Sequence, residues 1–304
     1  MSFRLFIYYC AVCGGWAAIV GWSLGRMIAG GEVILAAGVK GMFLGLLVAF
    51  ALGLVDGLWN QSRRFVTVGM RVLVAAAGGG LAGLVGGVIG QTFYSKYDLP
   101  VFLIMGWAIT GLLIGVSLGA FDFLARVLRG EDRRGALRKI LNGLIGGAVG
   151  GILGGILFLL VKSAWGGIFR DRQLDELWSP SAAGFVALGL CIGLAIGLAQ
   201  VILKDSWLRI EKGFRKGREM ILSKPEITLG RGEWCDVGLF GDPAVEKTHA
   251  RIRRSGNNYV LADEETAGGT FLNGQRIRQP ALLRSGDAIQ IGSSVLRFRE
   301  RQKR

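Results

Sequence analysis

The sequence predicts a helical domain that crosses a membrane repeatedly, followed by an all-β sandwich domain. Residues 1–203 contain 38 of the 50 glycines and six apolar stretches long enough to span a bilayer. Residues 204–304 instead contain short runs that alternate apolar and polar residues between turns. The long apolar runs exclude a disordered chain, and the glycines lack the three-residue period of collagen.

Each apolar stretch is long enough to cross the hydrocarbon core as a helix, which takes about 20 residues. None shows the polar face that a soluble helix of this length would carry. The first stretch is not expected to be a signal peptide, because no clear cleavage site follows it and five similar stretches come after it. The expected spans are 5–25, 33–58, 66–93, 101–124, 137–161 and 182–203.

Lysine and arginine predict the orientation of the spans, because short cytoplasmic loops carry an excess of these residues. The second-to-third loop, the fourth-to-fifth loop and the segment after the sixth span are strongly basic. Their cations are Arg63, Arg64, Arg126, Arg129, Arg133, Arg134, Lys204, Arg209, Lys212, Arg215, Lys216 and Arg218. The first-to-second and third-to-fourth turns hold only Arg26 and Lys96, and the fifth-to-sixth loop balances its charges. We therefore expect a multi-pass protein of the cytoplasmic (inner) membrane, with both termini in the cytoplasm.

The spans also repeat in sequence. The text GLLVAFALGLVD returns as GLLIGVSLGAFD and GLCIGLAIGLAQ, and GGWAAIVGW returns as GGLAGLVGG and GGAVGGILGG. These patterns predict three copies of a two-helix unit that all run in the same direction, unlike the inverted repeats of many transporters. Glycines at every fourth position let helix backbones approach closely. We expect this packing within one chain, with a homo-oligomeric pore as the alternative.

Charged residues inside the spans bear on a transport function. Asp56 and Asp122 occupy equivalent repeat positions, with Gln200 in the third copy. All three lie at the expected cytoplasmic ends of their spans, beside basic loops, so ion pairing at the membrane interface explains them without transport. Lys40 and Arg71 also lie near span ends, where long side chains can extend to the interface.

The β region divides into strand-like runs separated by closely spaced turns. The runs are ITLG, DVGLF, HARIR, NYVLAD, GTFLNGQRI, DAIQIG and VLRF. Asn273-Gly274 predicts a tight hairpin turn, because this dipeptide suits the two positive φ angles of a type I′ turn. We expect a membrane domain at 1–203, a basic linker at 204–218, a sandwich at 219–301 and a tail at 302–304.

The order of the motifs in the β region is specific. Gly230-Arg231 is followed by CDVGL, VEKTHARI, NYVLAD, GGTFLNG and SGDAIQIGSSVLRF. Over most of 220–299 this order resembles the forkhead-associated (FHA) domain. The resemblance implies a β-sandwich that binds phosphothreonine peptides through loops at one end.

The resemblance also assigns roles to single residues. Arg231 stands where the family has its phosphate-binding arginine, and a guanidinium offers a fork of donors to a phosphate dianion. His249 matches the family's structural histidine in the motif S-x-x-H, which makes it a packing and hydrogen-bonding residue rather than a catalytic one. The other residues of the implied structural motif are Gly230, Gly269, Asn273 and Gly274.

Three positions of the implied peptide site differ from the family pattern. The serine of S-x-x-H is Glu246, followed by Lys247 at a position that often helps to bind phosphate or peptide. The family's T-N-G-T loop begins with Ala267 and Gly268 instead of threonine and asparagine. A carboxylate about 4 Å from a phosphate costs roughly 1 to 4 kcal/mol, depending on the effective dielectric constant. Glu246 therefore predicts weakened binding, or it pairs with Arg231 as a built-in anion; ordinary phosphothreonine binding is the alternative.

The expected linker 204–218 places six cations among the apolar residues Trp207, Leu208, Ile210 and Phe214. This mixture suits the anionic inner leaflet of a lipid bilayer, at about 1 kcal/mol per cation. A plain solvated linker is the alternative. The net charge of +14 does not indicate nucleic acid as a partner, since topology explains much of it and no such motif is present.

The sequence thus predicts a membrane-anchored adaptor or scaffold that docks a protein partner, and the resemblance implies a partner that carries phosphothreonine. A channel or transporter regulated by its FHA domain is the alternative. We expect no enzyme, cofactor or metal, because the chain offers no nucleophile–base pair, carboxylate pair or ligand cluster. Cys10 and Cys13 form a C-x-x-C only within an apolar span.

Overall fold

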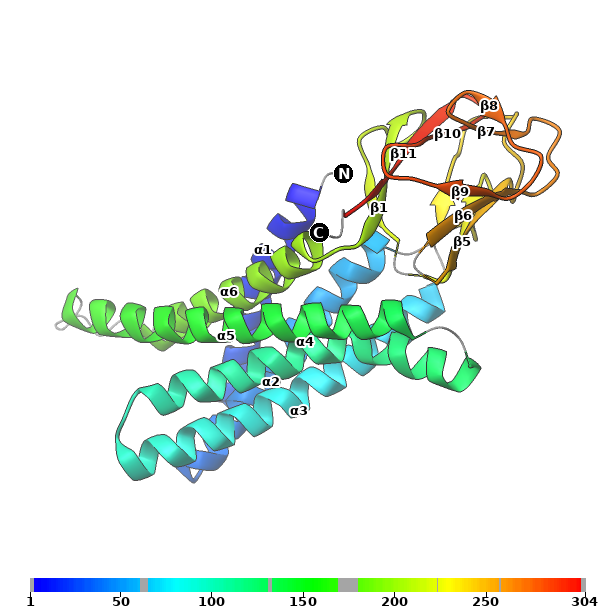
Figure 1. Ribbon diagram of the computed structural model, residues 1–304. Helices are drawn as coiled ribbons and strands as arrows, with labels where there is room; N and C mark the ends of the chain where they lie inside the picture. The colour runs from blue at the N-terminus through cyan, green and yellow to red at the C-terminus, as the bar shows by residue number, and fades with distance from the viewer. Residues whose placement is uncertain are drawn as a thin grey trace. The chain divides into compact units, whose positions relative to one another are not determined.

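The computed structural model describes residues 3–60, 65–130, 133–168, 180–222, 224–256 and 258–301. The chain divides into a helical unit, Phe6–Gly57 with Thr67–Leu203, and a second unit that contains the β domain Lys204–Arg304 (Figure 1). The loop cations expected at Arg63 and Arg64, the charges of 169–179 and the tail 302–304 lie outside the described residues.

Six helices in the N-terminal region are long and apolar enough to cross a membrane, as the sequence predicted. Their 18-residue windows have mean hydropathies from 1.6 to 2.4. Each helix lies at one of the expected spans, and most extend a few residues beyond it. The helices are α1 Phe3–Ile28, α2 Val33–Asn60, α3 Phe65–Tyr97, α4 Val101–Arg129, α5 Arg134–Ile168 and α6 Pro180–Ile202.

Glycines bring the backbones of neighbouring helices into contact. A Cβ atom added to any of these glycines would meet a carbonyl oxygen of the facing helix, so no larger residue fits without movement. The contacts join α2 to α3, α4 to α5 and α6 to α1, and further glycine contacts join α1 to α2, α3 to α4 and α5 to α6, so that the helix order closes into a ring. The glycine pairs of the first three contacts are Gly45–Gly79, Gly111–Gly147 and Gly189–Gly14, and the first glycine of each pair lies at an equivalent position of the predicted repeat.

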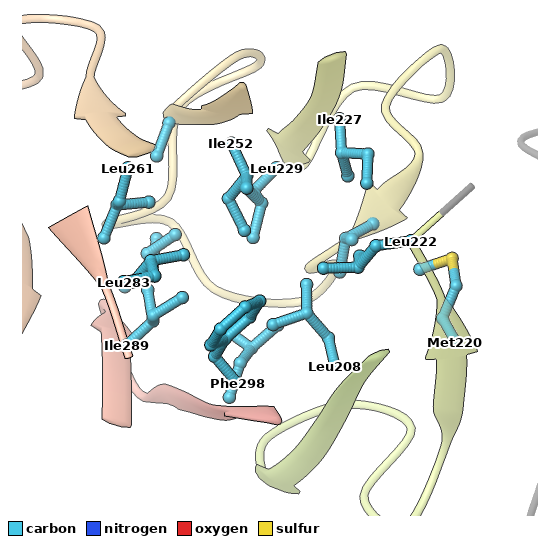
Figure 2. Close-up of a cluster of buried hydrophobic side chains, with 14 of the residues drawn as sticks. Leu208, Met220, Leu222, Ile227, Leu229, Ile252, Leu261, Leu283, Ile289 and Phe298 are labelled. Atoms are coloured by element: carbon cyan, nitrogen blue, oxygen red, sulfur yellow. The ribbon is translucent and has the colours of Figure 1, made fainter. Parts of the chain in front are cut away.

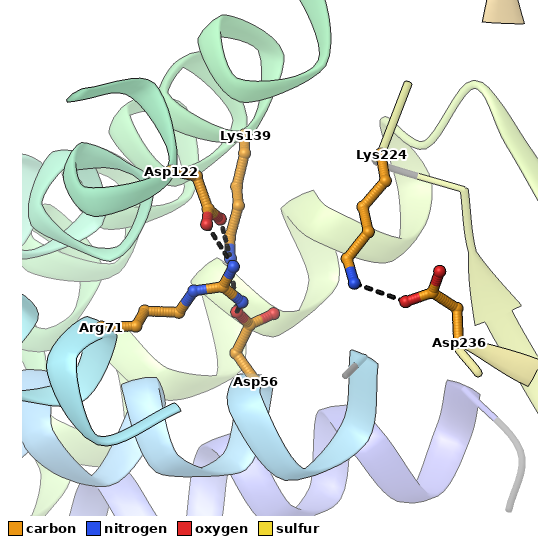
Figure 3. A network of polar contacts seen from close by, with 6 residues as sticks. All are labelled: Asp56, Arg71, Asp122, Lys139, Lys224 and Asp236. Atoms are coloured by element: carbon orange, nitrogen blue, oxygen red, sulfur yellow. Dashed lines mark hydrogen bonds and ion pairs between the residues drawn. The ribbon is translucent and has the colours of Figure 1, made fainter. Parts of the chain in front are cut away.

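A buried cluster of four charges joins α2, α3, α4 and α5 near one end of the helices (Figure 3). Arg71 contacts the carboxylates of Asp56, at 3.8 Å, and Asp122. Lys139 contacts the same two carboxylates, with 3.3 Å to Asp122. The expectation that Arg71 extends to the interface is wrong, because its side chain is only 7% exposed and is held by these carboxylates inside the bundle.

The C-terminal domain is a sandwich of two sheets. One sheet has the order β2-β1-β11-β10-β7-β8 and the other β4-β3-β5-β6-β9. Apart from the parallel pair β3–β4, all pairs are antiparallel. The strands are β1 Ser206–Lys212, β2 Glu219–Ile221, β3 Glu226–Gly230, β4 Val237–Gly238, β5 Ala250–Ser255, β6 Asn258–Asp263, β7 Thr270–Leu272, β8 Gln275–Arg276, β9 Ala281–Leu283, β10 Ala288–Ile291 and β11 Ser294–Glu300.

The two sheets enclose a core of aliphatic side chains with Phe298 between them (Figure 2). Phe298, Leu229 and Leu261 are fully buried there. The predicted hairpin is present, since Asn273 and Gly274 both have positive φ, at 52° and 83°, between β7 and β8. This turn fixes the register that pairs Phe271 with Arg276.

The expected linker 204–218 is wrong in its main part, because Ser206–Lys212 is strand β1 in the middle of a sheet. Leu208 and Ile210 face the sandwich core at 1% and 4% exposure and are therefore not available to a bilayer. Glu211 accepts two hydrogen bonds from the Arg297 guanidinium on β11, at 3.1 and 2.8 Å, and these bonds lower the pKa of this carboxyl. The charges on the outward face of β1 hide its alternating pattern in the sequence.

We expect Leu208→Ala to lower the free energy of unfolding of a 204–304 fragment by about 2 to 5 kcal/mol, because it leaves a cavity in the core. Arg209→Ala on the exposed face of the same strand should cost less than about 0.5 kcal/mol. Urea denaturation followed by circular dichroism measures both values. Equal effects of the two substitutions would contradict the placement of β1 in the sandwich.

We expect Asp56→Asn to destabilise the full-length protein in detergent by about 3 kcal/mol, because it leaves two buried cations with one carboxylate. Adding Lys139→Gln should recover part of the loss by restoring neutrality. Asp98→Asn, at an exposed position with φ 53° that asparagine tolerates, is the matched control and should be silent. Thermal unfolding of the four proteins gives the comparison, and a double variant less stable than Asp56→Asn would refute the pairing.

Candidate functional site

Three loops of the sandwich are joined by backbone hydrogen bonds at the position of the predicted peptide site. Loop 231–236 follows β3, loop 239–249 precedes β5, and loop 264–269 precedes β7. Arg231 N–H donates to Glu246 O at 2.9 Å, and Gly232 N–H donates to Lys247 O at 2.8 Å. Glu264 N–H donates to His249 O at 3.0 Å, which connects the third loop to the second.

His249 connects the same loops through its side chain. The imidazole is fully buried, and Nδ1 accepts a hydrogen bond from Glu246 N–H at 3.1 Å. This acceptor role puts the proton on Nε2, which faces Gly269 O at 3.2 Å and Thr266 Oγ1 at 3.0 Å. Both ring nitrogens are therefore used for structure, and His249 has no free nitrogen for catalysis.

Gly230 lets the first two loops approach at close range. A Cβ atom at this position would meet the carbonyl oxygens of Lys247 and Glu246, so any larger residue would push the loops apart. Cys235 supports the same contact, because its Sγ donates to Lys247 O at 3.0 Å. Burial raises the pKa of this thiol, which keeps it protonated and able to donate.

The charged candidate residues stand on this frame with exposed side chains. Arg231, Glu246 and Lys247 are all exposed, although their backbones are fixed by the hydrogen bonds above. Among the residues that the structure describes, no ion pair joins the Arg231 guanidinium to the Glu246 carboxylate. The expectation of a built-in anion on Arg231 is therefore not met, and both groups are open to a ligand.

The loop that replaces T-N-G-T is stabilised by hydrogen bonds from its own threonine hydroxyls to Asp263. Thr266 donates from its hydroxyl to Asp263 at 3.1 Å, and Thr270 donates to the same carboxylate oxygen at 2.5 Å. A Cβ atom on Gly268 would lie 2.9 Å from Ala244 O. The position of the family's asparagine is therefore occupied on one side by the preceding loop, and Gly268 permits that contact.

Two residues near the site, Arg276 and Trp234, were not predicted from the sequence. Arg276 lies over Gly269, and its Nη2 donates to Thr266 O at 3.2 Å and Ala267 O at 3.4 Å. The hairpin register predicted by Asn273-Gly274 places Arg276 opposite Phe271, and this register was the available signal. Trp234 is 49% exposed in the first loop, and its Nε1 lies 3.3 Å from Thr248 Oγ1. It adds an aromatic surface beside Lys247.

Two further hydrogen-bonded residues hold the neighbouring turns. Asn273 donates to the Asp287 carboxylate at 2.9 Å and accepts from Ala288 N–H at 2.9 Å, which ties the hairpin to β10. Asp242 accepts from Ser293 N–H at 2.6 Å and Ala244 N–H at 2.9 Å. These bonds, led by that from Ser293, lower the pKa of Asp242 and fix the loop that carries Glu246.

Comparisons with known proteins agree with the C-terminal assignment. The family model of the FHA domain matches residues 227–292, and no family model matches the N-terminal region. The chain is 32% identical over 132 residues to the glycogen accumulation regulator GarA of Mycolicibacterium smegmatis, which is 43% of this chain and 78% of that protein. It is 30% identical over 131 residues to the oxoglutarate dehydrogenase inhibitor of Corynebacterium jeikeium, which is 43% of this chain and 84% of that protein.

A solved FHA domain is also similar to part of this chain. An FHA domain from a structural and functional study of phosphothreonine-dependent FHA interactions is 28% identical, with a TM-score of 0.30. The match covers 33% of this chain and all of that domain.

The hydrogen bonds of Asp242 predict an acid-dependent stability. Because its pKa is lower in the folded domain, this carboxylate stabilises the fold above its ordinary pKa of about 3.9 and loses that contribution as the pH falls through the folded value. Asp242→Asn should therefore lower the melting temperature of the 204–304 fragment at pH 7 and reduce its further fall below pH 4. Glu265→Gln, an exposed carboxylate on the third loop, is the control. Parallel acid profiles of Asp242→Asn and the native fragment would refute this role.

Proposed function

Because this chain belongs to the forkhead-associated domain family, we propose that it is a membrane-held adaptor whose FHA domain binds a protein partner. One observation carries the proposal. The hydrogen bonds around His249 and Gly230 fix the backbones of Arg231 and Lys247 against each other while both cationic side chains remain exposed. A rigid pair of exposed cations on loops suits an anionic group of a docked partner, since little side-chain ordering beyond these two residues is needed.

The anionic group that we propose is phosphothreonine, bound at an altered site. Arg231 and Lys247 supply positive charge, and Arg276 adds a third cation beside Ala267. Glu246 opposes them, because an exposed carboxylate on the same loop repels a phosphate dianion. Gly268 removes the amide that would hold the peptide backbone. The altered site is therefore proposed to bind phosphothreonine weakly, or with a preference for partners whose own cations pair with Glu246.

Membrane anchoring is supported by the six long apolar helices. Arg126, Arg133 and Arg134, beside the α4–α5 turn, support a cytoplasmic position for that turn and for the FHA domain, which follows α6. Membrane fractionation with alkaline carbonate extraction tests the anchoring. Labelling of cysteines introduced at Arg133 and Asp98 tests the orientation, since only the first should be accessible from the cytoplasm.

The FHA-regulated channel or transporter remains the alternative function. Four buried charges, those of Asp56, Arg71, Asp122 and Lys139, contact one another across α2 to α5, and this structural role supports the adaptor. Reconstitution of the full chain in liposomes separates the two functions. Reproducible solute flux that Asp56→Asn abolishes would favour the transporter.

We expect the 204–304 fragment to bind a phosphothreonine peptide weakly and to lose that binding in Arg231→Ala. Glu246→Ser should tighten binding by roughly five-fold or more, because removing the carboxylate relieves at least about 1 kcal/mol of repulsion. Glu265→Ser removes a carboxylate from the third loop and should leave the affinity unchanged. Titration calorimetry against a phosphothreonine peptide library, with unphosphorylated peptides as the reference, measures these affinities.

Native binding tighter than about 10 µM that Glu246→Ser does not improve would refute the altered site. Peptide binding that is independent of phosphate and of Arg231 would leave the adaptor function standing but would refute phosphothreonine as its signal.

A further inference from the structure

The helical domain contains a half-open cavity of about 630 Å³ to which all six helices contribute. This volume lies in the range of small-molecule sites. Gly31 in the α1–α2 turn, Tyr94 near the end of α3 and Ser181 at the start of α6 place the cavity at the helix ends opposite the four-charge cluster. By the predicted orientation, this end faces away from the cytoplasm.

The part of the wall formed by α1 and α2 is cationic. Arg26 and Lys40 both line the cavity, and the lining residues within the described ranges include no aspartate or glutamate. Lys40 lies seven residues after the first residue of α2, about 10 Å along the helix. Among the described residues, no carboxylate lies within ion-pair distance of its ammonium group. A half-buried charge between apolar helices is costly unless it has a partner, so the position of Lys40 on the cavity wall indicates a function.

The part of the wall formed by α4, α5 and α6 is aromatic. Trp107, Phe158 and Phe185 pack together there, with ring centroids separated by 5.1 to 6.1 Å. Trp22, beside Arg26, adds a fourth ring on the cationic part, with the guanidinium 5.5 Å from the centroid of the indole. The cavity therefore offers one charged part and one apolar part to the same ligand.

Lys40 differs from the residues at the equivalent positions of the other two predicted repeats. The repeat offset of 66 residues relates Lys40 to Gly106 on α4, and the next offset of 78 residues relates Gly106 to Gly184 on α6. Both glycines serve packing, because a Cβ atom at Gly106 would meet Gly86 O at 2.6 Å and one at Gly184 would meet the Phe158 ring at 2.6 Å. Close packing therefore favours a small residue at this position of the repeat. The second and third copies have glycine there, whereas the first copy has the cation Lys40.

We infer that this cavity binds an anionic amphiphile, with a phosphate or carboxylate group at Arg26 and Lys40 and an apolar part against Trp107, Phe158 and Phe185. The ligand supplies the negative charge that Lys40 otherwise lacks inside the bundle. A bilayer lipid and a soluble amphiphile share this chemistry, and the test below distinguishes them. The site is independent of the FHA domain and of the proposed adaptor function.

Binding is tested on the full-length protein in a neutral maltoside detergent with octyl phosphate as the probe. Isothermal titration should show saturable binding that is at least ten-fold weaker in Lys40→Gln. Lys96→Gln is the matched control, because it removes an exposed cation at the same end of the helices, from a residue that does not line the cavity. Inorganic phosphate and octyl glucoside, which carry only the anion or only the tail, should each bind at least ten-fold more weakly than octyl phosphate.

Dihexanoyl phosphatidylglycerol identifies the source of the ligand. Binding of this lipid but not of octyl phosphate assigns the site to a bilayer lipid, binding of octyl phosphate but not of this lipid assigns it to a soluble amphiphile, and binding of both assigns it to the shared chemistry. Each of these results supports the site, and binding of neither probe overturns it. Ala36→Trp, which fills the cavity, should abolish binding of either probe without lowering the helix content. Arg26→Gln repeats the charge test should Lys40→Gln fail to fold.

Equal loss of binding in Lys96→Gln and Lys40→Gln would overturn the proposal, since the effect would then be general surface charge. Octyl glucoside binding as tightly as octyl phosphate, or undiminished binding in Ala36→Trp, would also overturn it.

Discussion

The structure depends on backbone contacts that only glycine permits. Helices in lipid lack the hydrophobic drive that packs soluble helices, so close van der Waals contact has to replace it. The pairs Gly45–Gly79, Gly111–Gly147 and Gly189–Gly14 provide this contact at three places and join α6 to α1. The same constraint operates in the sandwich, where Gly230 lets the Arg231 loop meet the Lys247 carbonyl. A methyl group at any of these positions would separate elements on which a site is built.

Close helix packing also determines which charges of the helical domain meet. Because α2, α3, α4 and α5 approach closely, Asp56, Arg71, Asp122 and Lys139 pair their opposite charges with one another. Such a group is strongly destabilised by the loss of one member and little affected by neutral replacement of a pair. It therefore fixes which helices are neighbours more than it adds net stability. The cavity lies at the opposite end of these helices.

The sequence predicted what depends on local patterns. The length of an apolar stretch is enough to predict a long apolar helix, and the dipeptide Asn273-Gly274 is enough to predict a tight hairpin turn. Both predictions are confirmed. Strand β1 was missed because Arg209, Glu211 and Lys212 give it the composition of a linker, while its pairing with β11 joins residues nearly a hundred positions apart. The domain therefore begins near 206 rather than 219.

Contacts between distant residues account for the other differences. Arg71 meets Asp122 across 51 residues, and Lys139 meets Asp56 across 83, which no local pattern reveals. The family resemblance located Arg231 and His249, but Arg276 becomes part of the site only through the fold of loop 264–269. Likewise, the sequence shows only that Gly268 replaces the family's asparagine. The structure adds the reason that a glycine fits there, because Ala244 O lies against this position.

Each domain leaves certain cations without a carboxylate partner among the described residues. In the FHA domain these are Arg231 and Lys247, which stand in water, where an unpaired charge costs little. The evidence that these two cations bind a ligand is the rigid backbone of the loops that carry them, rather than their lack of a partner. Lys40 is half-buried against the cavity between the apolar helices, where an unpaired charge costs more than in water, and this cost supports the proposed anion. An unpaired cation is therefore stronger evidence for a ligand in the helical domain than in the sandwich. The free-energy cost of leaving a charge unpaired rises as the dielectric constant of its surroundings falls.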